Sequence, residues 1–173
     1  MKKTMFWLLI AVFAFSGCEK DDICDGNTPT TPRLVIEFYD FNNPAVLKTV
    51  PNLRIVGEDM TEPLQLSSTN KIQLPLKTTE DKTQYSLTVN YGNSNPALVF
   101  TDTLDFNYLR TEQYISRACG FKTRFTLNAF TDPLKPVIIN NDASLDQGSW
   151  IRDVQILTTN IETENETHIK IFF

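Results

Sequence analysis

The chain has 173 residues and a net charge of −5 at pH 7, from 16 Lys and Arg against 21 Asp and Glu. This mild acidity, without any cluster of basic residues, argues against a nucleic-acid partner, because phosphate binding needs clustered Lys and Arg. A chain of this length is expected to fold around one hydrophobic core.

The N-terminal 17 residues have the three-part layout of an export signal. A basic start, Lys2 and Lys3, precedes an uncharged apolar run over residues 5–15, and two small residues follow. A membrane-spanning helix needs about 20 apolar residues, roughly twice this run. We therefore predict that residues 1–17 are a signal peptide that is removed, which leaves 14 basic and 21 acidic residues and a net charge of −7.

The residues at the end of this signal, Phe15-Ser16-Gly17-Cys18, resemble the lipobox of bacterial lipoproteins. In those proteins the cysteine receives diacylglyceryl and the chain is cut directly before it. Leu is usual three residues before the cysteine, where this chain has Phe15. The resemblance implies that Cys18 is lipidated and that acyl chains bind the protein to a membrane. The alternative is an ordinary secretory signal that leaves Cys18 as a free thiol.

The residues that follow, Glu19-Lys20-Asp21-Asp22, are similar to the Lys-acidic-acidic export signal of Bacteroidota lipoproteins. That signal directs a lipoprotein across the outer membrane. The resemblance implies a lipid-anchored protein of the outer membrane, displayed at the cell surface. The periplasmic face is the alternative, and the charges also suit a solvated tether.

If Cys18 carries lipid, two cysteines remain, Cys24 and Cys119, and an envelope compartment permits them to pair. We predict this disulfide. It would close a loop of about 95 residues, which the chain-entropy relation values at roughly 4 to 5 kcal/mol. The bond would hold the end of the tether against the folded domain, whereas two buried free thiols are the alternative.

Residues 18–32 are predicted to be a lipidated tether and linker, because residues 25–32 are rich in Gly, Pro, Asn and Thr. From Arg33 onward, short segments rich in β-branched and aromatic residues predict strands. The candidate segments, which together predict about nine or ten strands, are Leu34–Tyr39, Leu53–Val56, Ile72–Leu76, Gln84–Tyr91, Ala97–Phe100, Leu104–Tyr108, Tyr114–Ala118, Phe121–Ala129, Val137–Ile139, Trp150–Leu157 and His168–Phe173.

Helical patterns are poor, and only residues 143–150 suit a short helical turn. Pro75 cannot donate to a strand ladder and places Ile72–Leu76 at a sheet edge. The expected fold over residues 33–173 is a single all-β domain. We predict an antiparallel β-sandwich of about nine strands with Greek-key connections, immunoglobulin-like or fibronectin-like.

The whole mature chain resembles a family of uncharacterised Bacteroidota envelope lipoproteins that carry a domain of unknown function, and three segments carry this resemblance. The segments are Cys24–Leu34, Arg117–Phe121 and Thr167–Phe173. The resemblance brings no activity with it. Its two cysteines agree with the predicted disulfide.

Catalytic and metal-binding patterns are scarce, and we expect no catalytic residues, cofactor or metal. The single histidine, His168, is expected on the solvent side of the last strand, and a Cys119/His168 nucleophile pair would be removed by the disulfide. Asn140-Asn141-Asp142 with Asp146 offers oxygen ligands but lacks the calcium-loop spacing. Asp102-Thr103-Leu104 resembles a short bacterial O-glycosylation site.

Two classes of function remain. We favour a noncatalytic binding or structural module that contacts an envelope protein or a glycan through loops or through aromatic residues such as Tyr39, Phe41 and Trp150. The alternative is a surface hydrolase that acts on glycan or peptide with two carboxylates about 5 to 9.5 Å apart. Its candidates are Glu37, Asp40, Asp102 and Asp105.

Overall fold

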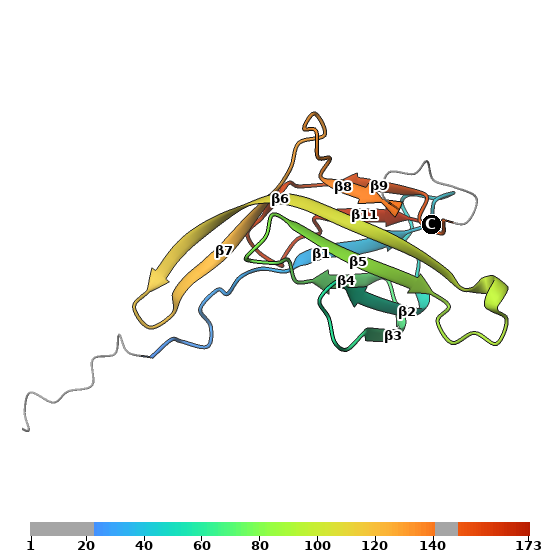
Figure 1. The fold of residues 1–173 in the computed structure, drawn as a ribbon, viewed down its shortest axis with the longest axis horizontal. Coiled ribbons are helices and arrows are strands. Elements are labelled where there is room, and N and C mark those ends of the chain that lie inside the picture. Colours follow the sequence, from blue (N-terminus) through green and yellow to red (C-terminus); the bar gives the residue numbers. More distant parts are fainter. Residues whose placement is uncertain (1–22, 141–148) are drawn as a thin grey trace, which may run out of the picture.

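A computed structural model describes residues 23–140 and 149–173. The described chain forms two β-sheets that pack face to face, with one short 3-10 helix, Pro96–Leu98 (Figure 1). The strands are β1 Leu34–Tyr39, β2 Val50–Gly57, β3 Leu64–Thr69, β4 Lys71–Leu74, β5 Lys82–Val89, β6 Phe100–Ser116, β7 Gly120–Leu127, β8 Val137–Ile139, β9 Asp153–Ile156, β10 Asn160–Ile161 and β11 Ile169–Phe172.

The smaller sheet has the strand order β4-β1-β11-β9, and the larger has β10-β7-β6-β5-β2-β3 with β8 paired to β6. The predicted all-β sandwich is confirmed, with eleven strands in the described residues against about nine expected. Neighbouring strands are antiparallel except for β1 and β11, which run parallel from the Ile36/Ile169 pair onward. The first and last strands therefore lie side by side in the middle of the smaller sheet.

The core lies between the two sheets and follows from the period of two along each strand. Side chains of a strand alternate between its faces, so every second residue enters the core. Leu34, Ile36 and Phe38 of β1 are fully buried in this way. Each fully buried large apolar side chain contributes about 1.5 to 3 kcal/mol relative to exposure. The core also contains alternating residues of the larger sheet, Leu53, Ile55, Tyr85, Leu87, Val89, Leu104, Phe106, Tyr108, Phe125 and Leu127.

One strand of the structure replaces two that the sequence predicts. Leu104–Tyr108 and Tyr114–Ala118 are expected as separate strands, but the 17-residue strand β6 contains all of the first and the second as far as Ser116. Residues 117 and 118 lie in the turn that follows β6. The polar residues of 109–113 hide this continuity, because both faces of β6 are largely open to solvent there. The second half of this long strand extends beyond β5 and pairs there with β7.

Other differences concern segments with little burial. Ala97–Phe100 is not a strand, because Pro96 and the Asn95 side chain, which accepts a hydrogen bond from the Ala97 N–H, start a 3-10 turn there. β3 and β10 are missing from the sequence prediction. β3 is an edge strand without a single fully buried side chain, so its pairing with β2 rather than a core pattern defines it. Pro75 directly follows β4, which lies at a sheet edge as predicted.

Candidate functional site

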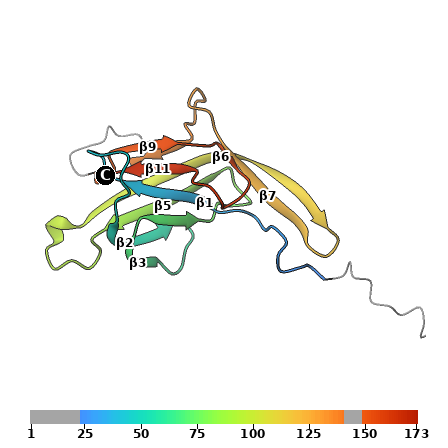
Figure 2. The same cartoon turned by 180° about the vertical axis from the view of Figure 1, so that it is seen from behind.

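The most distinctive feature is a two-stranded arm that projects from the sandwich (Figures 1 and 2). β6 pairs with β5 as far as Asn107 and with β8 as far as Phe106. From Tyr108 to Ser116 it pairs with β7 instead. We call residues 109–126, the part of this hairpin beyond β5 and β8, the arm; its base still contributes Phe125 to the core.

Polar contacts at its base fix the direction of the arm. The Tyr108 hydroxyl donates to the Lys77 carbonyl over 3.0 Å and lies 2.6 Å from the Thr83 hydroxyl, which donates to it. Burial raises the pKa of Tyr108, so the phenol keeps the proton that it donates. Arg110 is two residues after Tyr108 and on the same face of β6. Its guanidinium donates to the Asp81 carboxylate and to the Thr78 carbonyl, each over 2.6 Å.

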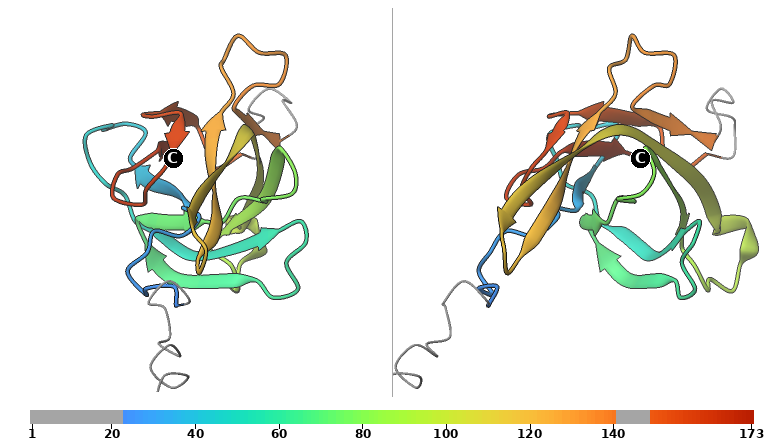
Figure 3. Two further views of the ribbon diagram at one scale, coloured as in Figure 1. Left: turned by 90° about the vertical axis from the view of Figure 1, so that its left-hand side faces the viewer. Right: turned by 60° about the vertical axis from the view of Figure 1, so that its left-hand side comes forward.

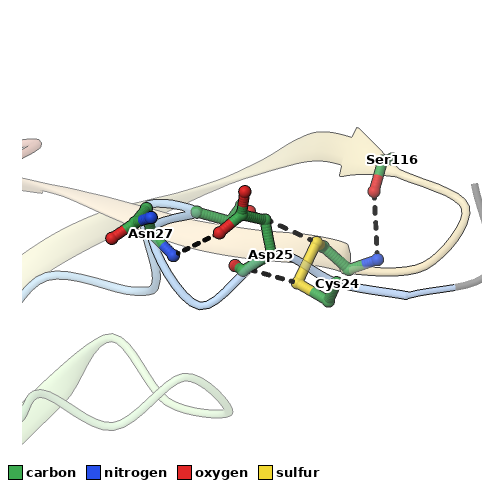
Figure 4. Close-up of a disulfide and its surroundings, with 6 residues drawn as sticks. Cys24, Asp25, Asn27 and Ser116 are labelled. Carbon is green, nitrogen blue, oxygen red and sulfur yellow. Dashed lines mark hydrogen bonds between the residues drawn. A yellow bond between two sulfur atoms is a disulfide. The ribbon is translucent and has the colours of Figure 1, made fainter. Parts of the chain in front are cut away.

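The tip of the arm is joined to the N-terminal segment by the predicted disulfide. Cys24 and Cys119 are bonded, with their Cα atoms 4.9 Å apart. Gly120 starts β7 with a φ of +67°, a conformation that glycine adopts without strain, and the Cys119 N–H donates to the Ser116 hydroxyl over 3.1 Å. Figure 4 shows the bond between this turn and the turn at Asp25 and Asn27. The bond therefore connects the start of the described chain to the far end of the arm.

The segment predicted as linker runs back from the disulfide along β7 to β1. Thr31 accepts a hydrogen bond from the Thr123 N–H of β7 over 3.0 Å. At the end of the segment, the Arg33 guanidinium binds both carboxylate oxygens of Glu164, the shorter contact being 2.6 Å. The segment is thus held at both ends and in between, and the arm and this segment leave the sandwich on the same side (Figure 3).

Apolar side chains are exposed at the arm tip. Tyr114 and Phe121 are cross-strand partners whose rings meet edge to face with centroids 5.3 Å apart, yet they remain 56% and 64% exposed. Ile23, next to the disulfide, is 79% exposed. Ile23, Tyr114 and Cys119 line one hollow of about 430 Å³. Large apolar side chains gathered on a surface usually mark a contact with a partner or a membrane.

A second hollow lies on the small sheet. It has a volume of about 420 Å³ and lies between strand β9 and the loop side chains Phe41 and Phe130, both of them half exposed or more. Phe41 is thus on the surface, as a ligand-contacting aromatic must be. Trp150 is not, because its ring lies in the core and its indole N–H donates to the Leu87 carbonyl over 3.0 Å. Tyr39 is half-buried beneath the Lys170 ammonium.

Several predicted site residues lie outside the described residues. These are the lipidation residue Cys18, the export-signal residues Glu19, Lys20, Asp21 and Asp22, and the calcium candidates Asn141, Asp142 and Asp146. Their neighbour Asn140 is described. Its side-chain amide donates to Asp102 over 2.8 Å and its carbonyl oxygen accepts the Thr103 N–H over 2.9 Å, so both ends of this side chain serve contacts within the fold.

Asp102 and Asp105, two of the candidate carboxylates, point to opposite faces of the larger sheet. Asp102 is buried in the core and accepts hydrogen bonds from Asn140, from the Ser149 hydroxyl and from the Ile151 N–H, each over 2.8 Å. Asp105 pairs with Lys82 over 2.8 Å on the outer face. Asp102 therefore ties β6 to both ends of the segment 141–148, and neither carboxylate faces a shared substrate site. Asp102-Thr103, expected as a glycan acceptor, lies within the paired part of β6.

Glu37 and Asp40, the other two, also make contacts that support the fold. Burial opposes ionisation of Glu37, but hydrogen bonds from Thr167, Tyr39 and Lys71 outweigh it and lower its pKa. A hydrogen bond from Lys48 lowers the pKa of Asp40, whose carboxylate also receives the N–H groups of the following turn. Both carboxylates therefore stay ionised, each beside a different lysine.

The expectation that His168 faces solvent is wrong, because its side chain is fully buried. Its Nδ1 accepts the Val35 N–H over 2.9 Å. Burial lowers the pKa of His168, although the carboxylates of Glu166 and Glu164 act against this. The imidazole is therefore neutral at pH 7 and serves the fold. The Cys119/His168 nucleophile pair does not form, because Cys119 is bonded to Cys24.

Two further searches of the described residues bear on function. In residues 23–140 and 149–173 there is no group of three or more His, Cys, Asp or Glu side chains placed to hold a metal ion. Nor does this part of the chain contain a helix long and apolar enough to cross a membrane.

Comparison with known proteins yields one match. Residues 52–173 match the model of a protein family described as a family of unknown function, DUF6452. This range begins within β2, at its third residue, includes β3 to β11 and the whole arm, and lies after Cys24 and β1. A search of curated proteins and a search of solved structures found no match.

Proposed function

Because this chain belongs to the DUF6452 family, whose function is unknown, we propose a role from its own geometry and N-terminal sequence. The protein is a noncatalytic binding or structural module of the bacterial envelope. Acyl chains on Cys18 anchor it in the outer membrane, and the sandwich presents its surface to an envelope protein or a glycan.

The observation that carries this proposal is the position of the Cys24–Cys119 bond. Without the bond, the 15 residues from Cys18 to Arg33 would let the sandwich lie up to about 50 Å from its anchor, at roughly 3.3 to 3.6 Å per residue. The bond leaves six free residues, which reach at most about 22 Å. A bond at the sixth residue after an anchoring cysteine keeps the arm tip within this distance of the membrane, so the end of the molecule that has the arm faces the anchor. The same bond on an unanchored chain would restrict only a terminus.

The noncatalytic part of the proposal is supported by the use of the reactive side chains. The buried groups Asp102 and His168 are engaged in hydrogen bonds that join strands and loops. Glu37, Asp40 and Asp105 pair with different lysines. A carboxylate-pair hydrolase needs two carboxylates that converge on one substrate, and these side chains serve separate contacts.

The proposed partner site is the hollow beside β9, walled by Phe41 and Phe130. It lies at the C-terminal end of β1, whereas the tether joins the N-terminal end of the same strand. An anchored sandwich therefore turns this hollow away from the tether. Exposed aromatic rings over a polar sheet face, here Asp153 and Gln155, suit a glycan or a protein loop.

Display at the cell surface is supported by the sequence Glu19-Lys20-Asp21-Asp22 directly after the anchoring cysteine. The alternative address, the periplasmic face, keeps the same anchor and the same orientation of the sandwich.

Lipidation is tested by intact-mass analysis and membrane fractionation of the wild type and of Cys18→Ser, both expressed in a Bacteroidota host. We expect diacylglyceryl on Cys18 and loss of the variant from the membrane fraction. Ser16→Thr, a conservative change within the signal, is the matched control and keeps the anchor. A Cys18→Ser protein that still sediments with membranes would contradict the proposal. Surface display is tested separately by treating intact cells with protease, which releases the domain only if it is exposed.

A further inference from the structure

We infer that the tip of the arm enters the headgroup region of the bilayer that holds the anchor, with Ile23, Tyr114 and Phe121 as the inserted side chains. This inference rests on the proposed lipid anchor. It adds a second, protein-mediated contact with the membrane, and it determines which end of the molecule faces the lipid.

The first support is the chemistry of the tip. Tyr114 and Phe121 form an edge-to-face pair on the inner face of the hairpin, where the same alternation nearer the sandwich supplies core residues such as Phe125. Among residues 23–140 and 149–173, no second sheet covers this face beyond the sandwich, so the pair stays exposed although the strand pattern is that of a buried face. Aromatic rings with a polar group, such as tyrosine, are favoured at the boundary between headgroups and acyl chains.

The second support is the short distance to the anchor. Ile23 is the fifth residue after Cys18, and the disulfide holds its neighbour Cys24 at the arm tip, with 4.9 Å between the bonded Cα atoms. Five extended residues span at most about 18 Å. The anchor and the tip are therefore confined to the same few nanometres, whatever path the intervening chain takes. The arm also projects on the side from which the tether leaves (Figure 3).

The third support is a pair of basic side chains at the tip. Arg117 is exposed in the turn of the hairpin, and Lys122 follows Phe121 on β7 with its side chain on the other face of the strand. Basic groups near a bilayer surface are attracted to anionic lipids by about 1 kcal/mol each. Acidic groups lie close by as well, because Asp25 lines the same hollow, Glu112 is exposed two residues before Tyr114, and Glu19, Asp21 and Asp22 precede Ile23. Arg117 and Lys122 therefore offer contacts to lipid phosphates, whereas the insertion itself depends on the apolar side chains and the short tether.

The experiment uses tryptophan as a depth probe in the lipidated full-length protein. Phe121→Trp is reconstituted into vesicles of equal parts phosphatidylethanolamine and phosphatidylglycerol, with or without bromine atoms on the upper acyl chain. The matched control is Phe130→Trp, because Phe130 is 66% exposed against 64% for Phe121 but lies in the loop beside β9. The wild type gives the background from Trp150, which is buried in the core.

We expect the Phe121→Trp emission to fall by about half with brominated lipid, as for a side chain roughly 5 to 10 Å into the headgroup and acyl boundary. The Phe130→Trp and wild-type emissions stay unchanged. Tyr114→Trp, which probes the other ring of the pair, gives the same result as Phe121→Trp. Both substitutions are at exposed positions, and near-ultraviolet circular dichroism checks that each variant is folded.

Vesicle flotation in the same samples separates the two possible failures. Protein that floats with the vesicles but shows equal emission with and without bromine overturns the inference and leaves the lipid anchor intact. Protein that does not float overturns the proposed anchor, and the inference with it. Quenching of Phe130→Trp as strongly as Phe121→Trp also contradicts the inference, because the sandwich would then lie on the membrane by another face.

Discussion

Val35 and His168 bind each other twice at the start of the parallel pair β1 and β11. The Val35 N–H donates to Nδ1 of the imidazole over 2.9 Å, and the His168 N–H donates to the Val35 carbonyl over 3.0 Å. Both residues are fully buried. The side chain of His168 therefore completes the ladder between the first and last strands, one residue before the Ile36/Ile169 pair begins it.

This arrangement predicts that stability falls as the solution becomes mildly acidic. Burial lowers the pKa of His168 below its ordinary value of 6.5, so the unfolded chain takes up a proton before the folded chain does. The stabilising contribution is complete above pH 6.5 and is lost as the pH falls below it towards the lowered pKa of the folded state. Urea unfolding at pH values from about 7.5 to 5.5 measures the effect, because carboxylates do not titrate appreciably in that interval.

The variant His168→Asn tests the origin of this pH dependence. Its amide oxygen can still accept the Val35 N–H, but the side chain does not titrate. We expect it to cost about 1 to 3 kcal/mol at pH 7 for the lost packing, and to show a flat profile over the same interval. A profile as steep as that of the wild type would assign the effect to another group. Because His168 is the single histidine in the chain, its imidazole resonances can be followed directly by NMR.

The Arg33–Glu164 pair predicts a second loss of stability, at a more acidic pH. A hydrogen bond from Arg33 lowers the pKa of Glu164, although burial acts against it. The contribution of this pair is therefore present above the ordinary pKa of 4.5 and is lost as the pH falls through the lowered value. The Arg33 side chain is 49% exposed, so solvent screening limits the pair to about 0 to 1 kcal/mol. We expect Glu164→Gln to lose this amount at pH 7 in urea unfolding and nothing below the lowered pKa. An equal loss at both pH values would mean that packing, not charge, supports the contact.

The disulfide predicts a large response to reducing agent. The loop between Cys24 and Cys119 spans 95 residues, so its loss is expected to lower the free energy of unfolding by about 2 to 5 kcal/mol. Reduction should also free residues 25–31 for cleavage by a broad-specificity protease, because the Thr31 contact to β7 alone does not hold them. Cys24→Ser with Cys119→Ser is the control, and reductant must leave its unfolding curve unchanged. If the wild type unfolds at the same urea concentration with and without reductant, the bond does not support the fold.

The strands with a strong apolar pattern in the sequence could be predicted, and those that depend mainly on pairing could not. Leu34–Tyr39 and Val137–Ile139 agree with β1 and β8 at both ends. β3 pairs with β2 along an open edge, and its apolar alternation is limited to Leu64 and Leu66, which is too short to identify a strand. The arm is hidden for a related reason. Its strands continue the core alternation, and Tyr114 and Phe121 are exposed because the smaller sheet, as far as the structure describes it, does not extend over this part of β6 and β7.

His168 and the disulfide also differ in how far the sequence alone could predict them, because the burial of His168 depends on the whole fold and the cysteine pairing does not. Alternation with the core residues Ile169 and Ile171 correctly assigns His168 to the outer face of the smaller sheet. A sequence pattern does not show that other parts of the chain cover this end of the face. The Cys24–Cys119 pair, in contrast, needs no knowledge of the fold, because the count of cysteines and the expected compartment left these two as partners.

The last prediction concerns Asp102, the buried carboxylate of β6. One of its oxygens accepts both the Ser149 hydroxyl and the Ile151 N–H, each over 2.8 Å. Asp102→Asn places an amide that donates hydrogen bonds among groups that also donate, which leaves buried donors without acceptors. We expect a loss of about 2 to 4 kcal/mol in urea unfolding, since hydrogen bonds to a buried charged group are stronger than those between neutral groups.

The matched control is Glu162→Gln, because Glu162 pairs with Arg124 at a side-chain exposure of 52% and is expected to contribute about 0 to 1 kcal/mol. If the two variants lose the same amount, Asp102 does not hold the segments around Asn140 and Ile151 together. A larger loss for Asp102→Asn, without a change in the unfolding slope, would assign to this carboxylate the structural role of joining β6 to the segments on both sides of residues 141–148. That role would also explain why an acidic residue is placed in a sandwich core.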